Sequence, residues 1–211
     1  MNILKPRNIH IEALRNKRLC DLFEDEKISF CNFEKEKYDD LNLYEIEFEH
    51  CRFSGISLQN GALEKLSFSD VIFEQCNFSN TQFLSSSFIR CEFNNCKISG
   101  CSFAENRLLN VTFSDTSAGY LNLSLASIEN ILFKNTTLKN SYFQESKIKN
   151  IYFENADLTQ ANFFKTSLKG VDLSSSKIEG IVISAEDIKG AVIDSSQMAD
   201  LVYLLGVKLK K

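Results

Sequence analysis

Large apolar residues recur every five positions through most of this 211-residue chain. Sixteen of the 18 phenylalanines have numbers ending in 3 or 8, and only Phe30 and Phe164 do not. Between positions 23 and 198 there are 36 such anchor positions, and 35 of them hold Phe, Leu, Ile, Tyr or Met. The exception is Ala118. Because the frame never slips, a single structural rule must place all of these side chains.

A period of five fits neither an α-helix nor a straight strand. On a helix, five residues turn by about 500°, so successive anchors would point about 140° apart. On a strand, an odd spacing sends successive anchors to opposite faces. The pattern becomes consistent if the chain turns by about 90° every five residues, because every anchor then points to one central axis. The sequence therefore predicts an all-β fold, a right-handed quadrilateral β-helix of about nine coils with 20 residues in each.

Two columns of inward residues follow from this 20-residue coil. Residues 20 apart stack at about 4.8 Å, and each fully buried phenylalanine contributes about 2–3 kcal/mol. One column predicts a ladder of seven rings: Phe33, Phe53, Phe73, Phe93, Phe113, Phe133 and Phe153. The position two residues before each anchor holds small residues, among them six of the seven cysteines: Cys31, Cys51, Cys76, Cys91, Cys96 and Cys101. These thiols are interpreted as buried and free, although stacked pairs such as Cys76 and Cys96 would lie within reach of a strained disulfide.

Individual five-residue units resemble the pentapeptide-repeat family, whose unit is written A(D/N)LXX. The segments 156–160 (ADLTQ) and 161–165 (ANFFK) match this unit as they stand, and 76–80 (CNFSN) matches with Cys in place of Ala. The resemblance covers about residues 26–200, in one unbroken frame. It implies the same solenoid that the period predicts.

The two ends of the solenoid need caps, because each coil contacts only its neighbours. We expect residues 1–22 to form the N-terminal cap, 23–194 the solenoid, and 195–211 a C-terminal helix and strand. Ser195 and Ser196 offer helix caps, and Gly206 offers a helix end. The apolar residues of this segment predict either a dimer interface or a monomeric cap: Leu201, Val202, Leu204, Leu205, Val207 and Leu209. Near the other end, Glu36 falls at an inward site, so its unit is expected to be distorted.

Catalysis, cofactor binding and metal binding find little support in the sequence. His10 and His50 are the only histidines, no nucleophile pattern accompanies them, and no glycine-rich phosphate loop occurs. No apolar stretch approaches the length of a membrane span, and the first residues do not read as a signal peptide. The expectation is a cytoplasmic, non-enzymatic protein with reduced thiols, no cofactor and no metal. A net charge of −4 argues against nucleic-acid binding.

Charge is unevenly distributed along the chain. Residues 21–50 carry 11 acidic and 3 basic residues, net −8, while residues 1–20 carry +4. The acidic stretch is either a solvated face or a mimic of DNA. The coils total −10, whereas roughly 43 Å of duplex holds about 25 charges, so mimicry would depend on shape and local patches. The predicted outward acidic residues are Glu34, Asp39, Asp40, Glu45, Glu47, Glu49, Asp70 and Glu74.

A second predicted outward feature is apolar. Leu84, Ile89 and Leu109 lie at outward positions of the frame, with Ile89 and Leu109 on one wall. A cluster of this kind is either a contact site for a partner or incidental surface.

Within the pentapeptide-repeat family, the chain resembles the Qnr quinolone-resistance group. It shares a solenoid of the whole chain length, an acidic surface and a C-terminal segment that contains LLGVKL, and it is most similar to the chromosomal Qnr proteins of Gram-positive bacteria, the enterococcal ones among them. The resemblance implies a homodimer joined at its C-termini that binds DNA gyrase and topoisomerase IV in place of DNA. It would protect them from quinolones, here without the loops that interrupt the repeat in many Gram-negative members. The alternative is a scaffold for a partner that is not a topoisomerase.

Overall fold

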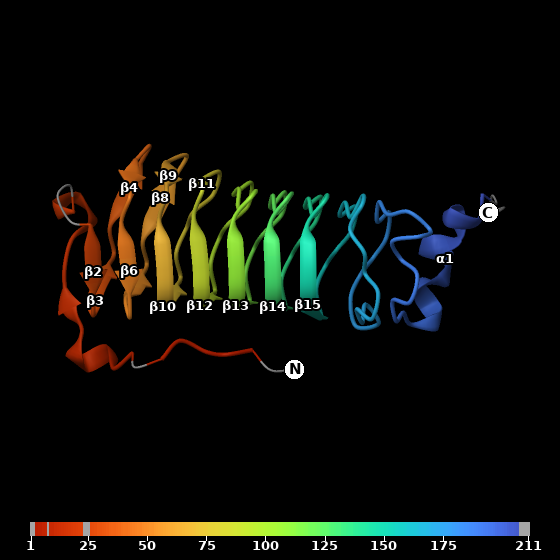
Figure 1. Cartoon of the computed structure of the whole chain (residues 1–211), viewed down its shortest axis with the longest axis horizontal. Helices are drawn as coiled ribbons and strands as arrows, with labels where there is room; N and C mark the ends of the chain where they lie inside the picture. The colour runs from red at the N-terminus through yellow and green to blue at the C-terminus, as the bar shows by residue number, and fades with distance from the viewer. Residues whose placement is uncertain (1–2, 8, 23–25, 207–211) are drawn as a thin grey trace.

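The computed structural model describes residues 3–7, 9–22 and 26–206, and it shows an elongated parallel β-solenoid (Figure 1). Strands pair in parallel with partners 20 residues away, and only the pairing of β1 with β3 has a different offset. The strands are β1 (Arg15–Asn16), β2 (Lys27–Ser29), β3 (Cys31–Glu34), β4 (Lys37–Asp39), β5 (Leu43–Tyr44), β6 (Glu47–Glu49), β7 (Arg52–Ser54), β8 (Ser57–Gln59), β9 (Ala62–Glu64), β10 (Ser67–Glu74), β11 (Gln82–Leu84), β12 (Ser87–Asn94), β13 (Arg107–Ser114), β14 (Ser127–Lys134) and β15 (Lys147–Glu154). The predicted fold class is confirmed.

Each coil has four faces, which we number in chain order. Face I holds residues 27–29 and their equivalents 20 apart, face II holds 32–34, face III 37–39 and face IV 42–44. The long strands β10 and β12–β15 run across faces I and II, so the largest sheet wraps one corner of the rod. β2, β6, β10, β12, β13, β14 and β15 stack in this order, and regular strand pairing therefore covers about seven turns rather than nine. Isolated bridges carry the register on as far as Asp172 and Val192.

The corners have a backbone cause that the apolar pattern does not reveal. Every residue whose number is divisible by five, from Phe30 to Gly170, has a positive φ, for example 54° at Asn95 and 52° at Asp115. One residue in this left-handed conformation redirects the chain between two short strand segments. Asn, Asp and Gly are frequent at these corners because they adopt the conformation at the least steric cost.

The core is a column of stacked rings, as the sequence predicts. The seven phenylalanines from Phe33 to Phe153 lie face to face, with centroids 4.4–5.7 Å apart. Rings of adjacent faces meet edge to face, as Phe93 and Phe103 do at 6.1 Å. Ala118, the one small anchor, is fully buried in the same core.

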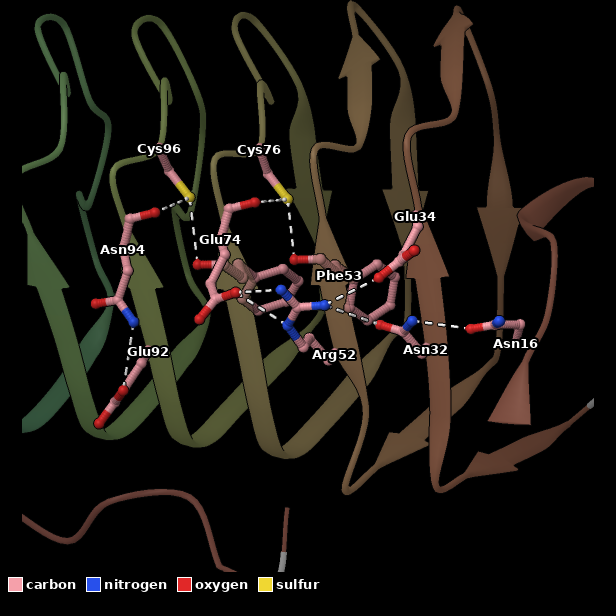
Figure 2. Close-up of polar contacts among 11 residues, drawn as sticks. Asn16, Asn32, Glu34, Arg52, Phe53, Glu74, Cys76, Glu92, Asn94 and Cys96 are labelled. Atoms are coloured by element: carbon pink, nitrogen blue, oxygen red, sulfur yellow. Dashed lines mark hydrogen bonds and ion pairs between the residues drawn. The ribbon is translucent and has the colours of Figure 1, made fainter. Parts of the chain in front are cut away.

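The cysteine thiols are free and serve as small core residues. All seven are unpaired with one another, and six of them are buried. The Cys76 thiol donates to the carbonyl oxygens of Phe53 and Glu74, both at 3.4 Å (Figure 2). Burial raises the pKa of Cys91 to about 12, so this thiol stays protonated and unreactive near neutral pH.

At the first coil, the structure corrects the expectation for Glu36. β4 keeps its register with β8, so the five-residue unit is not distorted. The Glu36 carboxylate instead accepts the Leu19 amide at 3.0 Å and the Tyr38 hydroxyl at 2.5 Å. Leu19 begins the short 3-10 helix η2 (Leu19–Asp21) and Leu22 follows it, and both leucines are buried over this coil. An inward carboxylate is thus accommodated by the cap that covers it.

The last coil ends in three short helical segments: η3 (Ser195–Gln197), α1 (Met198–Leu201) and η4 (Val202–Leu205). The cap residue is Asp194, in a capping box with Gln197, and not Ser195 or Ser196 as predicted. The buried Gln197 amide also donates to the Leu173 and Ser176 carbonyls at 2.9 and 2.6 Å. Gly206 ends the segment with φ of 69°, in agreement with the sequence. The predicted strand over 207–209 lies outside the described residues.

Candidate partner-binding surfaces

Ion pairs neutralise several of the predicted acidic residues. On face II, Arg52 lies between Glu34, at 3.2 Å, and Glu74, at 2.6 Å (Figure 2). The Arg52 guanidinium also donates to Asn32 Oδ1 at 3.3 Å, and Asn32 in turn donates to Asn16. One arginine therefore pairs with two carboxylates, and the three side chains together keep a net charge of −1.

Two lysines act in the same way on the neighbouring faces. Lys27 lies 3.9 Å from Glu47 and 3.1 Å from Glu49, and Lys65 lies 2.9 Å from Glu45. The hydrogen bond from Lys65 lowers the pKa of Glu45. These pairs are open to solvent, so salt screens them and a charged partner can displace either member.

Asp70 is not an outward residue, and the prediction was wrong for it. The residue is 2% exposed, and its carboxylate accepts hydrogen bonds from Arg90 Nε at 2.6 Å and Arg90 Nη2 at 2.5 Å. It also accepts the backbone N–H of Arg7 at 2.9 Å. Burial alone would raise the pKa of Asp70, but the hydrogen bonds from Arg90 and Arg7 outweigh it, so the pKa is lowered.

Asp70 is buried because the N-terminal segment lies over it. Residues 3–7 and 9–14, which we call the N-terminal arm, run along the rod rather than over its end (Figure 1). The Leu4 amide donates to Asn110 Oδ1 at 3.2 Å, and His50 Nδ1 lies 2.9 Å from the Arg7 carbonyl. The arm thus follows the corner between faces I and II across several coils. We expected residues 1–22 to form a cap, whereas their described part up to residue 14 lies along the rod; the excess of positive charge in residues 1–20 was the available signal for an arm on an acidic rod.

Asp39 and Asp40 remain as exposed acidic residues. Neither forms an ion pair with another described residue. Asp39 lies at the end of β4 on face III, and Asp40 occupies the corner between faces III and IV, with φ of 61°. That corner is diagonally opposite the one that the basic arm covers. These two exposed carboxylates, Asp39 and Asp40, form what we call the acidic ridge.

The predicted apolar residues lie on two faces. Ile89 and Leu109 are direct neighbours on β12 and β13, and both are half-buried. Leu84, on β11 of face IV, is 40% exposed and is separated from them by the corner at Ser85. The structure therefore brings together two of the three residues, and the third lies round a corner from them.

The predicted dimer residues divide into two groups. Leu201 and Leu204 pack against the solenoid core and close its last coil. Val202 is half-buried, whereas Met198 and Tyr203 beside it are 62% and 45% exposed. The Leu205 side chain, Val207 and Leu209 lie outside what the structure describes. Part of this segment therefore serves as a cap, and part of it stays open to solvent.

In residues 3–7, 9–22 and 26–206, no group of three His, Cys, Asp or Glu side chains is arranged to hold a metal ion. Within the same residues, no helix has the length and apolar character needed to cross a membrane.

These observations define a class of protein: a repeat solenoid whose candidate sites lie on its walls and ends. A model of the pentapeptide repeat region matches residues 86–163, and a model of eight pentapeptide copies matches residues 67–104. Residues 67–163 are thus similar to pentapeptide-repeat proteins, and the chain has the pentapeptide-repeat fold. No curated protein matches its sequence.

Solved structures of pentapeptide-repeat proteins are similar at low identity. HetL from the cyanobacterium Nostoc sp. strain PCC 7120, a pentapeptide repeat protein involved in heterocyst differentiation regulation, is 12% identical; the match covers 80% of this chain and 90% of HetL, with a TM-score of 0.49. A trypsin-treated variant of QnrB1, a plasmid-mediated fluoroquinolone resistance protein, is 19% identical over 93% of this chain and 96% of that chain, with a TM-score of 0.42.

Proposed function

We propose that this protein binds DNA gyrase, topoisomerase IV or both by mimicking DNA, and that it protects them from quinolones. The proposal follows the resemblance to the Qnr group, and to its chromosomal Gram-positive members in particular. The observation that carries it is the acidic ridge: exposed carboxylates on a straight solenoid, along a corner that the basic arm leaves open. On this proposal the protein is cytoplasmic, as its partners are, and has no catalytic role.

The ion pairs restrict how such mimicry of DNA can work. Since Arg52, Lys27 and Lys65 already neutralise nearby carboxylates, uniform charge density is not the basis of recognition. A topoisomerase surface that binds duplex would instead meet a local acidic ridge on a rod, and its own cations would compete for the solvent-exposed pairs. Binding should therefore weaken with salt and be competed by DNA.

Neutralising the acidic ridge tests this proposal. In supercoiling by purified gyrase with a fluoroquinolone, titrated protein should restore activity. Asp39→Asn/Asp40→Asn should need about tenfold more protein, because two exposed charges steer and hold the partner. Asn tolerates the left-handed conformation at position 40, so the fold is kept.

The matched control removes two exposed charges from the other end of the rod, as Glu179→Gln/Glu186→Gln. It should protect as the natural protein does. If the natural protein fails to protect several bacterial gyrases, including that of its own source, the alternative scaffold function takes precedence. Equal losses in both double variants would argue for net charge instead of the ridge.

We further propose that the protein is a homodimer through its C-terminal end. Val202→Asp is expected to give a monomer in sedimentation experiments, because a charge would be buried in the interface. Leu125→Asp is the control, since Leu125 is 54% exposed in the middle of the rod. Leu204→Asp would also lower stability, because Leu204 packs on the core. A dimer that persists in Val202→Asp, or a natural protein that is monomeric, would contradict this interface.

A further inference from the structure

The hydrogen-bond ladder of the solenoid is interrupted on two of its four faces. β15 is the last strand of the largest sheet, and no backbone hydrogen bond joins it to residues 167–174, the next turn of the described chain. One turn earlier the same position is bonded normally, with Asn135 N to Glu154 O at 2.9 Å. Here Asn155 N finds only the Ser175 hydroxyl, at 3.4 Å.

On faces III and IV the same two turns stay paired. Leu158 N donates to Lys177 O and Phe163 N to Val182 O, both at 2.8 Å. One turn later pairing resumes on face II, where Val192 N donates to Val171 O at 2.8 Å. The solenoid is therefore open like a wedge between β15 and residues 167–174, and closed elsewhere around this coil.

A cavity of about 570 Å³ fills this opening. That volume is within the range of sites that bind small ligands and short peptides. β15 contributes Ile148, Ile151 and Tyr152 to its walls, and the next turn contributes Lys169 and Val171. Gly170 also lines it, and a Cβ at that residue would meet no atom within 4 Å. We call this space the β15 cleft.

The edge of β15 presents backbone groups to the cleft. In earlier turns the N–H of an anchor donates to the following turn, as Phe83 N does to Ser102 O at 2.9 Å. The I/II corner residue does the same, as His50 N does to Ser69 O at 3.0 Å. By this register the N–H groups of Ile148, Asn150 and Phe153 point into the cleft without a backbone acceptor. An exposed strand edge of this kind is a template for another strand.

The charges around the cleft indicate what a strand there should carry. Glu129 on β14 and Lys149 on β15 are direct neighbours and form an ion pair. Lys169 follows at the same position on the far side of the cleft, so a strand inserted between the two turns would have a lysine on either side at this position. Asp172 lies further along the same wall. A parallel strand with an acidic residue between the lysines and a basic residue beside Asp172 would be complementary to these charges.

We propose that the β15 cleft is a binding site for an extended peptide segment of a partner protein, which adds to β15 as a parallel strand. The segment carries an acidic residue near its start and a basic residue three positions later. This site is separate from the acidic ridge, so the proposal does not depend on the topoisomerase function. The probe for this site is the peptide Thr-Val-Asp-Gly-Val-Lys-Val-Thr, whose sequence follows the five-residue frame of the solenoid.

Amide hydrogen exchange tests the open edge directly. In the free protein, the amides of Ile148, Asn150 and Phe153 should exchange at least about tenfold faster than their equivalents on β14, which is paired along its whole length. Adding the peptide should slow exchange at these three amides. A peptide N-methylated at its lysine lacks the backbone N–H that would donate to a β15 carbonyl oxygen. It should therefore not slow exchange at these three amides.

A charge swap tests the orientation. Lys169→Glu should weaken the peptide about tenfold in fluorescence anisotropy and strengthen the reversed peptide, with Lys and Asp exchanged. Lys189→Glu, at the same position one turn beyond the cleft, should change neither affinity. Three results would overturn the proposal: β15 amides protected in the free protein, equal binding of the N-methylated peptide, or concentration-dependent protection without peptide, which would make a second copy the occupant.

Discussion

Phe93→Ala is expected to lower the free energy of unfolding by about 3–5 kcal/mol, the range for removing a buried aromatic ring. Phe93 is fully buried and stacks on Phe73 at 4.4 Å and on Phe113 at 4.8 Å. It also meets Phe103 edge to face. Because backbone ladders hold the coils at a fixed spacing on both sides, the neighbouring rings cannot close the gap, and the cavity persists.

Thermal unfolding measures this effect. For a chain of this length the loss corresponds to a fall of roughly 10 °C in Tm. Phe164→Ala is the matched control: Phe164 lies outside the anchor frame and is 48% exposed, so its replacement should shift Tm by no more than about 2 °C. Unchanged stability in Phe93→Ala would mean that the ring column is not what holds the coils together.

The fold could be predicted from the sequence because one coil depends on its neighbours in a regular way. Each anchor meets the same environment as the anchors 20 residues away, so the apolar pattern alone identifies the columns. The same regularity held at Glu36, where we expected a distortion. The prediction failed there because it considered the carboxylate without the Leu19 amide and Tyr38 hydroxyl that satisfy it.

The candidate sites were less predictable because they depend on contacts that do not repeat. The N-terminal arm reaches Asn110 from Leu4, 106 residues away in sequence, and nothing periodic indicates that contact. Asp70 has the number of an outward corner and is buried only because the arm crosses it. The β15 cleft is a break in a backbone ladder, and the side-chain frame continues through it without a slip. Corners and anchors are thus local consequences of sequence, whereas the arm and the cleft are not.

Arg90→Met is expected to lower the free energy of unfolding by about 3 kcal/mol at pH 7, because it leaves the buried Asp70 carboxylate without its cation. The Arg90 side chain is 21% exposed and Asp70 is 3% exposed, so water cannot replace the lost partner. Met keeps the apolar length of the arginine stem. The remaining donor would be the Arg7 amide of the arm, and we therefore expect the arm to be held less firmly.

The pH dependence of this loss separates a buried charge from lost packing. In the natural protein the pKa of Asp70 is lowered, so the pair stabilises the fold above the ordinary carboxyl pKa of about 4, and this contribution is lost as pH falls through the lower folded value. In Arg90→Met the pKa should rise, because burial is then largely unopposed. The destabilisation should thus be large at pH 7 and shrink as pH falls below about 4, where Asp70 of the variant becomes protonated in both the folded and the unfolded chain. Adding Asp70→Asn to the variant should restore most of the stability at pH 7, since no buried charge remains. A loss that is constant with pH and unaffected by Asp70→Asn would assign the effect to packing of the arginine stem alone.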